Sequence, residues 1–189
     1  MRLFVALSIP AEVRENIASL IASLRRADAK SRWVNPQNLH VTLKFIGETA
    51  SEKVPAICDA LATIATAQPL LLEFRDVGFF PNVRRPSVAW IGIEAPPALA
   101  LLATDVNRVL TSIGVPREEK LFVPHLTIAR FKETRLSPAL QAEIEKHKDQ
   151  SFGSCTADEI HLIESRLKSS GAEYTTLRSF PFAPKESQG

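Results

Sequence analysis

A tetrad that occurs twice constrains this chain more than any other feature. Residues 40–43 read His-Val-Thr-Leu, and residues 125–128 read His-Leu-Thr-Ile. Each tetrad lies in an apolar run of alternating character, which is typical of a β-strand. Side chains alternate between the two faces of a strand, so we expect each His and the Thr two residues later on one face. The pattern therefore predicts two matching strands that each present an imidazole and a hydroxyl.

Helical and strand patterns are mixed along the chain, in the order β-α-β-α-β-β-α-β-α-β-β. Helices are expected over 10–26 and 51–67, from Pro96 to a stop at Gly114, and from Ser137; strands are expected over 2–8, 39–46, 70–80, 87–94, 122–131, 159–166 and 174–182. Two hairpins imply antiparallel pairing, which favours an α+β fold over a parallel doubly wound sheet. Because each half contains one histidine strand, we expect one domain, 1–189, built from two pseudo-symmetric lobes.

Composition narrows the class of protein. The 189 residues are 45% hydrophobic and 23% charged, as in ordinary globular proteins, and the net charge is only +2. We therefore expect contact with nucleic acid to be short and local. No apolar stretch reaches the roughly 20 residues of a membrane span, and the apolar start runs directly into charged residues, unlike a signal peptide. Cys58 and Cys155 are expected to be buried reduced thiols in a cytoplasmic monomer.

The paired His and Thr side chains suit metal-free cleavage of a phosphodiester. Cleaving a phosphodiester needs a base that activates the attacking group and an acid that protonates the leaving oxygen, on opposite sides of phosphorus. Histidine titrates near neutral pH and can serve as either. Thr42 and Thr127 can donate hydrogen bonds to the non-bridging oxygens. Spacing alone leaves open which of His40 and His125 is the acid.

Two basic residues follow the tetrads. By alternation Lys44 shares a face with His40 and Thr42, and we interpret it as a solvated lysine. Arg130 is expected on the opposite face from His125, unless a bulge or bend turns it. Arg130 is either a phosphate ligand or a surface arginine at the end of a strand, and both interpretations stay open.

Other candidates are weaker. His147 is expected at a solvated helix end and His161 in a strand, and a structural role is favoured for both. A metal site is disfavoured because no further His or carboxylate lies two to four residues from either tetrad histidine on its strand. Arg84 and Arg85 either follow upstream phosphates or lie in a solvated turn. Five aromatic residues could stack on a terminal base, although most are expected in the core: Phe4, Trp33, Phe79, Phe80 and Tyr174.

Residues 38–48 and 124–130 resemble the tetrad segments of the 2H phosphoesterases, which carry two His-x-Thr-x motifs. The chain is most similar to the RNA 2′,3′-cyclic phosphodiesterases, also called 2′-5′ RNA ligase-like proteins. The resemblance covers nearly the whole chain, through 2–6, 32–34, 78–86 and 164–174 as well as the tetrads.

The resemblance implies a bilobal fold in which antiparallel sheets line a central cleft and helices lie outside. It also implies hydrolysis of a terminal RNA 2′,3′-cyclic phosphate to a 2′-phosphomonoester, without metal or cofactor. His40 would be the proton donor and His125 the proton acceptor. From the residues themselves, Thr42, Thr127 and Arg130 are the candidates for binding substrate. Three alternatives stay open: a 2′-5′ RNA ligase, a cyclic phosphodiesterase of small nucleotides, and a non-catalytic module that binds RNA ends.

Overall fold

A computed structural model describes residues 1–64, 68–133, 135–169 and 171–182. These residues form nine strands, four α-helices and two 3₁₀ helices, η1 and η2. The elements are β1 (Arg2–Leu7), α1 (Ala11–Ala27), β2 (Arg32–Trp33), η1 (Pro36–Asn38), β3 (Val41–Glu48), η2 (Ser51–Lys53), α2 (Val54–Ala62), β4 (Leu70–Phe80), β5 (Val88–Glu94), α3 (Pro97–Thr111), β6 (His125–Arg130), α4 (Pro138–Glu145), β7 (Ser151–Ala157), β8 (Glu159–Lys168) and β9 (Gly171–Pro181).

The strands form two antiparallel sheets with related strand orders. The β1 sheet has the order β3-β1-β8-β9, and the β5 sheet has the order β2-β6-β5-β4-β7. Without β2, the two orders match position by position, with a tetrad strand at one edge and β1 or β5 beside it. The expected α+β fold with one histidine strand in each of two lobes is therefore confirmed, and β2 is the strand that breaks the symmetry.

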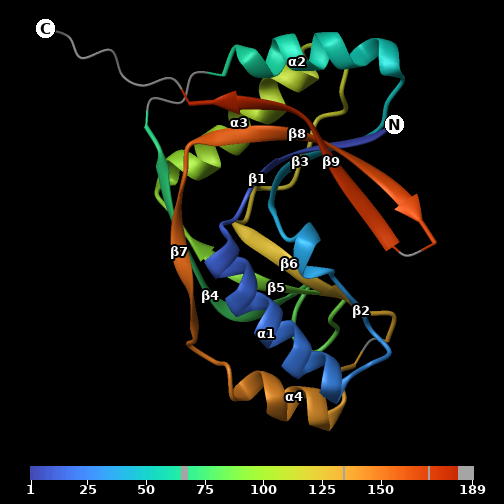
Figure 1. The fold of residues 1–189 in the computed structure, drawn as a ribbon, viewed down its shortest axis with the longest axis vertical. Helices are drawn as coiled ribbons and strands as arrows, with labels where there is room; N and C mark the ends of the chain where they lie inside the picture. Colours follow the sequence, from blue (N-terminus) through green and yellow to red (C-terminus); the bar gives the residue numbers. More distant parts are fainter. Residues whose placement is uncertain (65–67, 134, 170, 183–189) are drawn as a thin grey trace, which may run out of the picture.

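The helices cross between the two sheets. Helix α1 follows β1 but packs against β7 of the β5 sheet, whereas α3 follows β5 but packs against β3 of the β1 sheet. Figure 1 shows α2 and α3 at one end of the molecule and α1 and α4 at the other. The apolar stripe of α1, at Val13, Ile17, Leu20, Ile21 and Leu24, is buried as the helical periodicity predicts. Each lobe thus takes its covering helices from both halves of the chain.

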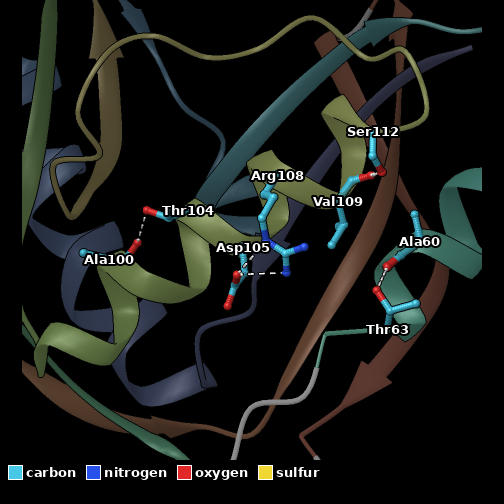
Figure 2. Close-up of polar contacts among 8 residues, drawn as sticks. All are labelled: Ala60, Thr63, Ala100, Thr104, Asp105, Arg108, Val109 and Ser112. Atoms are coloured by element: carbon cyan, nitrogen blue, oxygen red, sulfur yellow. Dashed lines mark hydrogen bonds and ion pairs between the residues drawn. The ribbon is translucent and has the colours of Figure 1, made fainter.

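Polar side chains on the outer helices are satisfied locally (Figure 2). In α3, the Thr104 hydroxyl donates to the Ala100 carbonyl at 3.0 Å, and the Arg108 guanidinium donates to the Asp105 carboxylate at 3.1 Å. This contact pairs the positive charge of Arg108 within its own helix. No helix in the described part of the chain is long and apolar enough to cross a membrane.

The structure differs from the expected elements in a few places. Strand β7 was not expected, because in Ser-Phe-Gly-Ser-Cys-Thr-Ala only Phe152 and Ala157 are buried apolar residues and the alternation is weak. The helix expected from Ser51 starts as η2 and continues as α2 only to Ala62; its expected end at 65–67 lies outside the described residues. Strand β6 begins at His125 rather than residue 122, directly after a proline that cannot donate to a ladder.

Candidate active site

The two tetrad histidines have the same local geometry. His40 directly precedes β3, and His125 is the first residue of β6. His40 Nδ1 lies 2.6 Å from the Asn38 carbonyl oxygen, and His125 Nδ1 lies 2.6 Å from the Val123 carbonyl oxygen. A carbonyl oxygen only accepts, so each Nδ1 carries a proton and donates it. In each neutral ring Nε2 is therefore the basic nitrogen, free to accept a proton or, once protonated, to donate one.

A β-bulge follows the Thr of the first tetrad. In the register of β3 with β1, Thr42 lies opposite Ala6 and Lys44 lies opposite Val5, while Leu43 has no partner. Directly opposed residues share a face of the sheet, and consecutive residues of β1 point to opposite faces. Thr42 and Lys44 therefore point to opposite faces, because the bulge places one extra residue between them on β3 while their partners on β1 are consecutive.

The bulge turns Lys44 away from the tetrad. Its side chain is only 5% exposed, and its Nζ donates to the Asn107 side-chain oxygen and the Pro116 carbonyl, both at 2.8 Å. Burial lowers the pKa of Lys44, and the negative charge of Glu118 opposes part of this shift. The expectation of a solvated lysine on the His40 face is therefore wrong: Lys44 connects β3 to α3 and the loop after it.

A second bulge occurs at the same place in the second tetrad. In the register of β6 with β5, Thr127 lies opposite Trp90 and Arg130 lies opposite Val88, while Ile128 has no partner. Positions 88 and 90 share a face of β5, so Thr127 and Arg130 share it too. His125, opposite position 92, also points to this face, which we call the His125 face. Simple alternation predicts that Arg130 points away from His125. This is wrong, because the bulge at Ile128 adds one residue between Thr127 and Arg130 and so returns Arg130 to the His125 face.

His40 is enclosed by aromatic rings. Its ring centroid is 4.7 Å from that of Phe4 and 5.3 Å from that of Tyr174. Phe4 shares its face of β1 with Ala6, the partner of Thr42, so His40 and Thr42 lie on one side of the sheet. Burial lowers the pKa of His40, and the hydrogen bond to the Asn38 carbonyl opposes part of the shift. In the free protein this environment favours the neutral imidazole.

His125 has a different aromatic neighbour. The edge of its ring meets Phe80, with centroids 5.0 Å apart, and Phe80 packs in turn on Trp90 at 5.2 Å. The Trp90 ring lies over Gly78, where an added Cβ would come within 2.0 Å of the indole. Only glycine fits there, so Gly78 allows Trp90 to lie flat on the His125 face. Sequence reasoning missed Trp90, because its role depends on which strand lies beside β6.

The two histidine-bearing faces adjoin. Strands β3 and β6 are in contact, although they belong to different sheets. Burial raises the pKa of Tyr174, and the positive charges of Arg130 and Arg2 oppose part of that rise. Tyr174, which packs on His40, therefore lies near Arg130 of the other sheet. The Asn38 amide also donates to the Ala172 carbonyl at 2.7 Å, which joins the segment before His40 to β9.

The other sequence candidates divide into two groups. Phe4, Phe80 and Tyr174 lie beside the tetrad histidines. Trp33 and Phe79 instead pack against Phe131. Phe45, which sequence reasoning missed, is 64% exposed on the same side of the β1 sheet as Phe4.

Three further sequence candidates have defined surroundings. Arg84 and Arg85 are exposed in a turn where their backbone amides donate to the Asn82 side chain. His161 is buried and its Nδ1 is 2.8 Å from the Ser179 hydroxyl, in keeping with a structural role.

Three further features concern the remaining predictions. His147 is half-buried, and its Nδ1 is hydrogen-bonded to the Gln150 side-chain oxygen, so the prediction that it is solvated is wrong. Cys58 is buried as expected, but Cys155 is only half-buried. Within the described ranges, no three His, Cys, Asp or Glu side chains gather as a metal site would require.

A family model described as "LigT like Phosphoesterase" matches the chain twice, at residues 7–90 and 91–174. The two matches cover most of the chain, and each tetrad falls at nearly the same distance from the start of its match. The repeated fold and the paired tetrads are therefore those of a two-repeat phosphoesterase. The chain belongs to the LigT-like phosphoesterase family.

Individual relatives can be aligned with this chain along almost its whole length. The chain is 36% identical over 180 residues to the RNA 2′,3′-cyclic phosphodiesterase of Archaeoglobus fulgidus, covering 95% of this chain and 99% of the relative. It is 33% identical over 180 residues to the protein of that name from Methanocaldococcus jannaschii, covering 95% and 100%. Among solved structures, TT0787 of Thermus thermophilus superposes with a TM-score of 0.82 at 27% identity, covering 98% of this chain and 100% of that one. E. coli LigT complexed with 3′-AMP has a TM-score of 0.76 at 29% identity, covering 96% and 98%.

Proposed function

We propose that this protein hydrolyses the terminal 2′,3′-cyclic phosphate of RNA to a 2′-phosphomonoester, using His40 and His125 for proton transfer. One observation carries the proposal: both histidines donate Nδ1–H to a backbone carbonyl two residues earlier, which leaves both Nε2 atoms for chemistry. A binding module would not need two proton-transfer groups oriented alike. The relatives named RNA 2′,3′-cyclic phosphodiesterase support the same activity.

The reaction needs one proton removed and one supplied. His125 Nε2 takes a proton from water as the water oxygen bonds to phosphorus. The phosphorus–O3′ bond breaks, and His40 Nε2–H protonates O3′, which leaves a 3′-hydroxyl and a 2′-phosphate. Each transfer contributes about 10²- to 10⁴-fold in rate. Only a ribose with a 2′-oxygen can form the cyclic substrate, so RNA is selected over DNA by the chemistry itself.

The lowered pKa of His40 must be reconciled with a role as proton donor. In the free protein, burial disfavours the imidazolium. A bound phosphate brings a negative charge, which favours the charged ring. His40 would therefore take up its proton as the substrate binds, and the donor would be charged mainly in the complex.

Thr42, Thr127 and Arg130 would stabilise the charge that builds up on the non-bridging oxygens. The two hydroxyls can each donate one hydrogen bond. The bulge at Ile128 sets Arg130 on the His125 face, where its planar guanidinium can donate two parallel bonds to a phosphate. Fixed donors of this kind act where charge develops and need no reorganisation during the step.

The test is turnover of a short RNA that ends in a 2′,3′-cyclic phosphate, in EDTA, with the product assigned by phosphorus NMR. We expect a 2′-phosphate, and we expect His40→Ala and His125→Ala each to lower kcat by about 10²- to 10⁴-fold. His147→Ala, in the α4 region, is the matched control and should keep full activity. Absence of turnover by the unmodified protein, or activity that EDTA abolishes, would contradict the mechanism. Adding an RNA with a free 5′-hydroxyl to the same reaction tests 2′-5′ joining.

A further inference from the structure

Two arginines lie directly opposite each other at the edge of the β5 sheet. Arg32 of β2 is the cross-strand partner of Arg130 of β6. Directly opposed residues share a face, so Arg32 joins Arg130, Thr127 and His125 on the His125 face. Both arginines are exposed. This edge has no counterpart in the β1 sheet, where β3 has no strand beyond it among the described residues.

This arginine pair has no acidic partner in the part of the chain that the structure describes. Other exposed cations do: Arg108 pairs with Asp105, and Lys146 pairs with Glu143. Like charges directly opposite on neighbouring strands destabilise the pairing. Two facing guanidiniums without a carboxylate therefore leave a local positive charge that an anionic ligand can neutralise.

The backbone that carries Arg32 is firmly held. The next residue, Trp33, points to the other face, where its indole N–H donates to the Asp28 carbonyl at 2.7 Å and its ring meets the edge of Phe131. The Val34 amide donates to the carbonyl of Ile128, the bulged residue, at 2.9 Å. Because the two residues after Arg32 are held in this way, the backbone of Arg32 stays opposite that of Arg130.

The spacing fits two successive phosphates. Thr127 and Arg130 lie opposite residues two apart on β5, which places them about 7 Å apart along the sheet, with Arg32 about 5 Å further across it. A cyclic phosphate at His125 and Thr127 would thus have Arg130 beside it and Arg32 beyond. The next phosphate along an RNA strand would meet Arg32.

We propose that Arg32 binds the phosphodiester immediately upstream of the terminal cyclic phosphate, with Arg130 between the two phosphates. The substrate class is then an oligonucleotide with at least one internal phosphodiester rather than a nucleoside 2′,3′-cyclic monophosphate. This inference rests on the proposed function. In this proposal Arg32 binds the substrate and favours oligonucleotides, and it takes no part in proton transfer.

The experiment compares kcat/KM for adenosine 2′,3′-cyclic phosphate with kcat/KM for a dinucleotide that ends in the same group. We expect the unmodified protein to prefer the dinucleotide, and Arg32→Gln to reduce the ratio of the two constants about tenfold, as loss of one charged hydrogen-bonding contact predicts. Arg108→Gln removes an exposed arginine elsewhere (Figure 2) and should leave the ratio unchanged. Losing one phosphate contact should also make the salt dependence of log KM for the dinucleotide shallower, by about 0.7.

A second substrate makes the test specific to charge. A dinucleotide with a neutral methylphosphonate linkage should lose the preference in the unmodified protein, and Arg32→Gln should then add no further loss. The proposal is overturned if Arg32→Gln lowers both constants equally, leaves their ratio unchanged, or acts equally on the neutral linkage. Lack of turnover of either substrate by the unmodified protein would instead refute the proposed function, a distinct result.

Discussion

The β3 half and the β6 half of this protein are alike in backbone and different in surroundings. Both tetrads hold the histidine by an Nδ1–H···O=C bond two residues back, and both have a bulge directly after the Thr. Five residues after the histidine, however, β3 carries Phe45 and β6 carries Arg130. In the described parts of the two sheets, only β6 has a further strand, β2, at its outer side.

This difference shows how a repeat can supply two chemical roles. A duplicated backbone gives two imidazoles with the same free nitrogen, which would behave identically in identical environments. Phe4 and Tyr174 lie beside His40, whose pKa is lowered by burial, whereas Arg130 and Arg32 lie on the His125 face. In the proposed mechanism, the backbone gives both histidines the same free Nε2, and the neighbouring side chains give the two rings different environments.

Among changes that leave both histidines in place, the largest effect should come from removing the charge that distinguishes the β6 half. We expect Arg130→Gln to lower kcat about 10²-fold, in the range measured when one donor to a developing oxyanion is removed. Arg130→Lys should recover part of this, because it keeps the charge but loses the two-pronged geometry. Steady-state kinetics on a cyclic-phosphate dinucleotide check this, with Arg108→Gln as control. Equal rates for Arg130→Gln and the unmodified protein would remove Arg130 from the site.

The Thr hydroxyls should matter less, and in both halves. We expect Thr42→Val and Thr127→Val each to lower kcat about tenfold, the lower end of the effect of a lost hydrogen bond to a charged group. Thr→Ser at the same positions keeps the hydroxyl and should cost no more than about threefold. Kinetics of the four variants make the comparison; identical rates for the Ser and Val variants would rule out the hydroxyl role.

The titration of His40 should be shifted and should respond to a ligand. NMR of the imidazole should give a pKa below the ordinary value of about 6.5 in the free protein, and a higher pKa with adenosine 2′-phosphate bound. Since the unfolded chain binds this proton more readily, the free energy of unfolding should fall as pH drops below about 6.5 through the folded pKa. His40→Gln should remove that part of the pH dependence. A His40 pKa that does not rise on ligand binding would contradict its role as donor.

The smallest effect should appear in stability. Arg32→Gln relieves the repulsion with Arg130 and should raise the free energy of unfolding by about 0.2–1 kcal/mol. Arg108→Gln removes an ion pair one helical turn apart and should lower it by about 0.2–0.5 kcal/mol. Urea unfolding of the two variants measures both, and opposite signs are expected. A destabilising Arg32→Gln would show that the facing arginines do not repel.

Much of the fold follows from periodicity in the sequence, because long apolar patterns specify long elements. The helical stripes, the tetrad strands and the hairpin of β4 and β5 were all expected on that basis. The bulges were not, and they decide where Lys44 and Arg130 point. A bulge depends on the register between two strands that are distant in sequence, so no local pattern in β3 or β6 reveals it. Trp90 was not predicted as a site residue for the same reason, because its position opposite Thr127 depends on the register between β5 and β6.

The central place of β1 in its sheet has a consequence for synthesis. β1 pairs on one side with β3, made soon after it, and on the other with β8, at residues 159–168. Until β8 has been synthesised, one edge of the apolar strand β1 is unpaired and can form non-native strand pairs. Pairing across so long a stretch of chain is also slow, because the intervening loop must close first. This sheet, and the aromatic enclosure of His40 to which Tyr174 of β9 contributes, can therefore form only after residues 159–181 have been made.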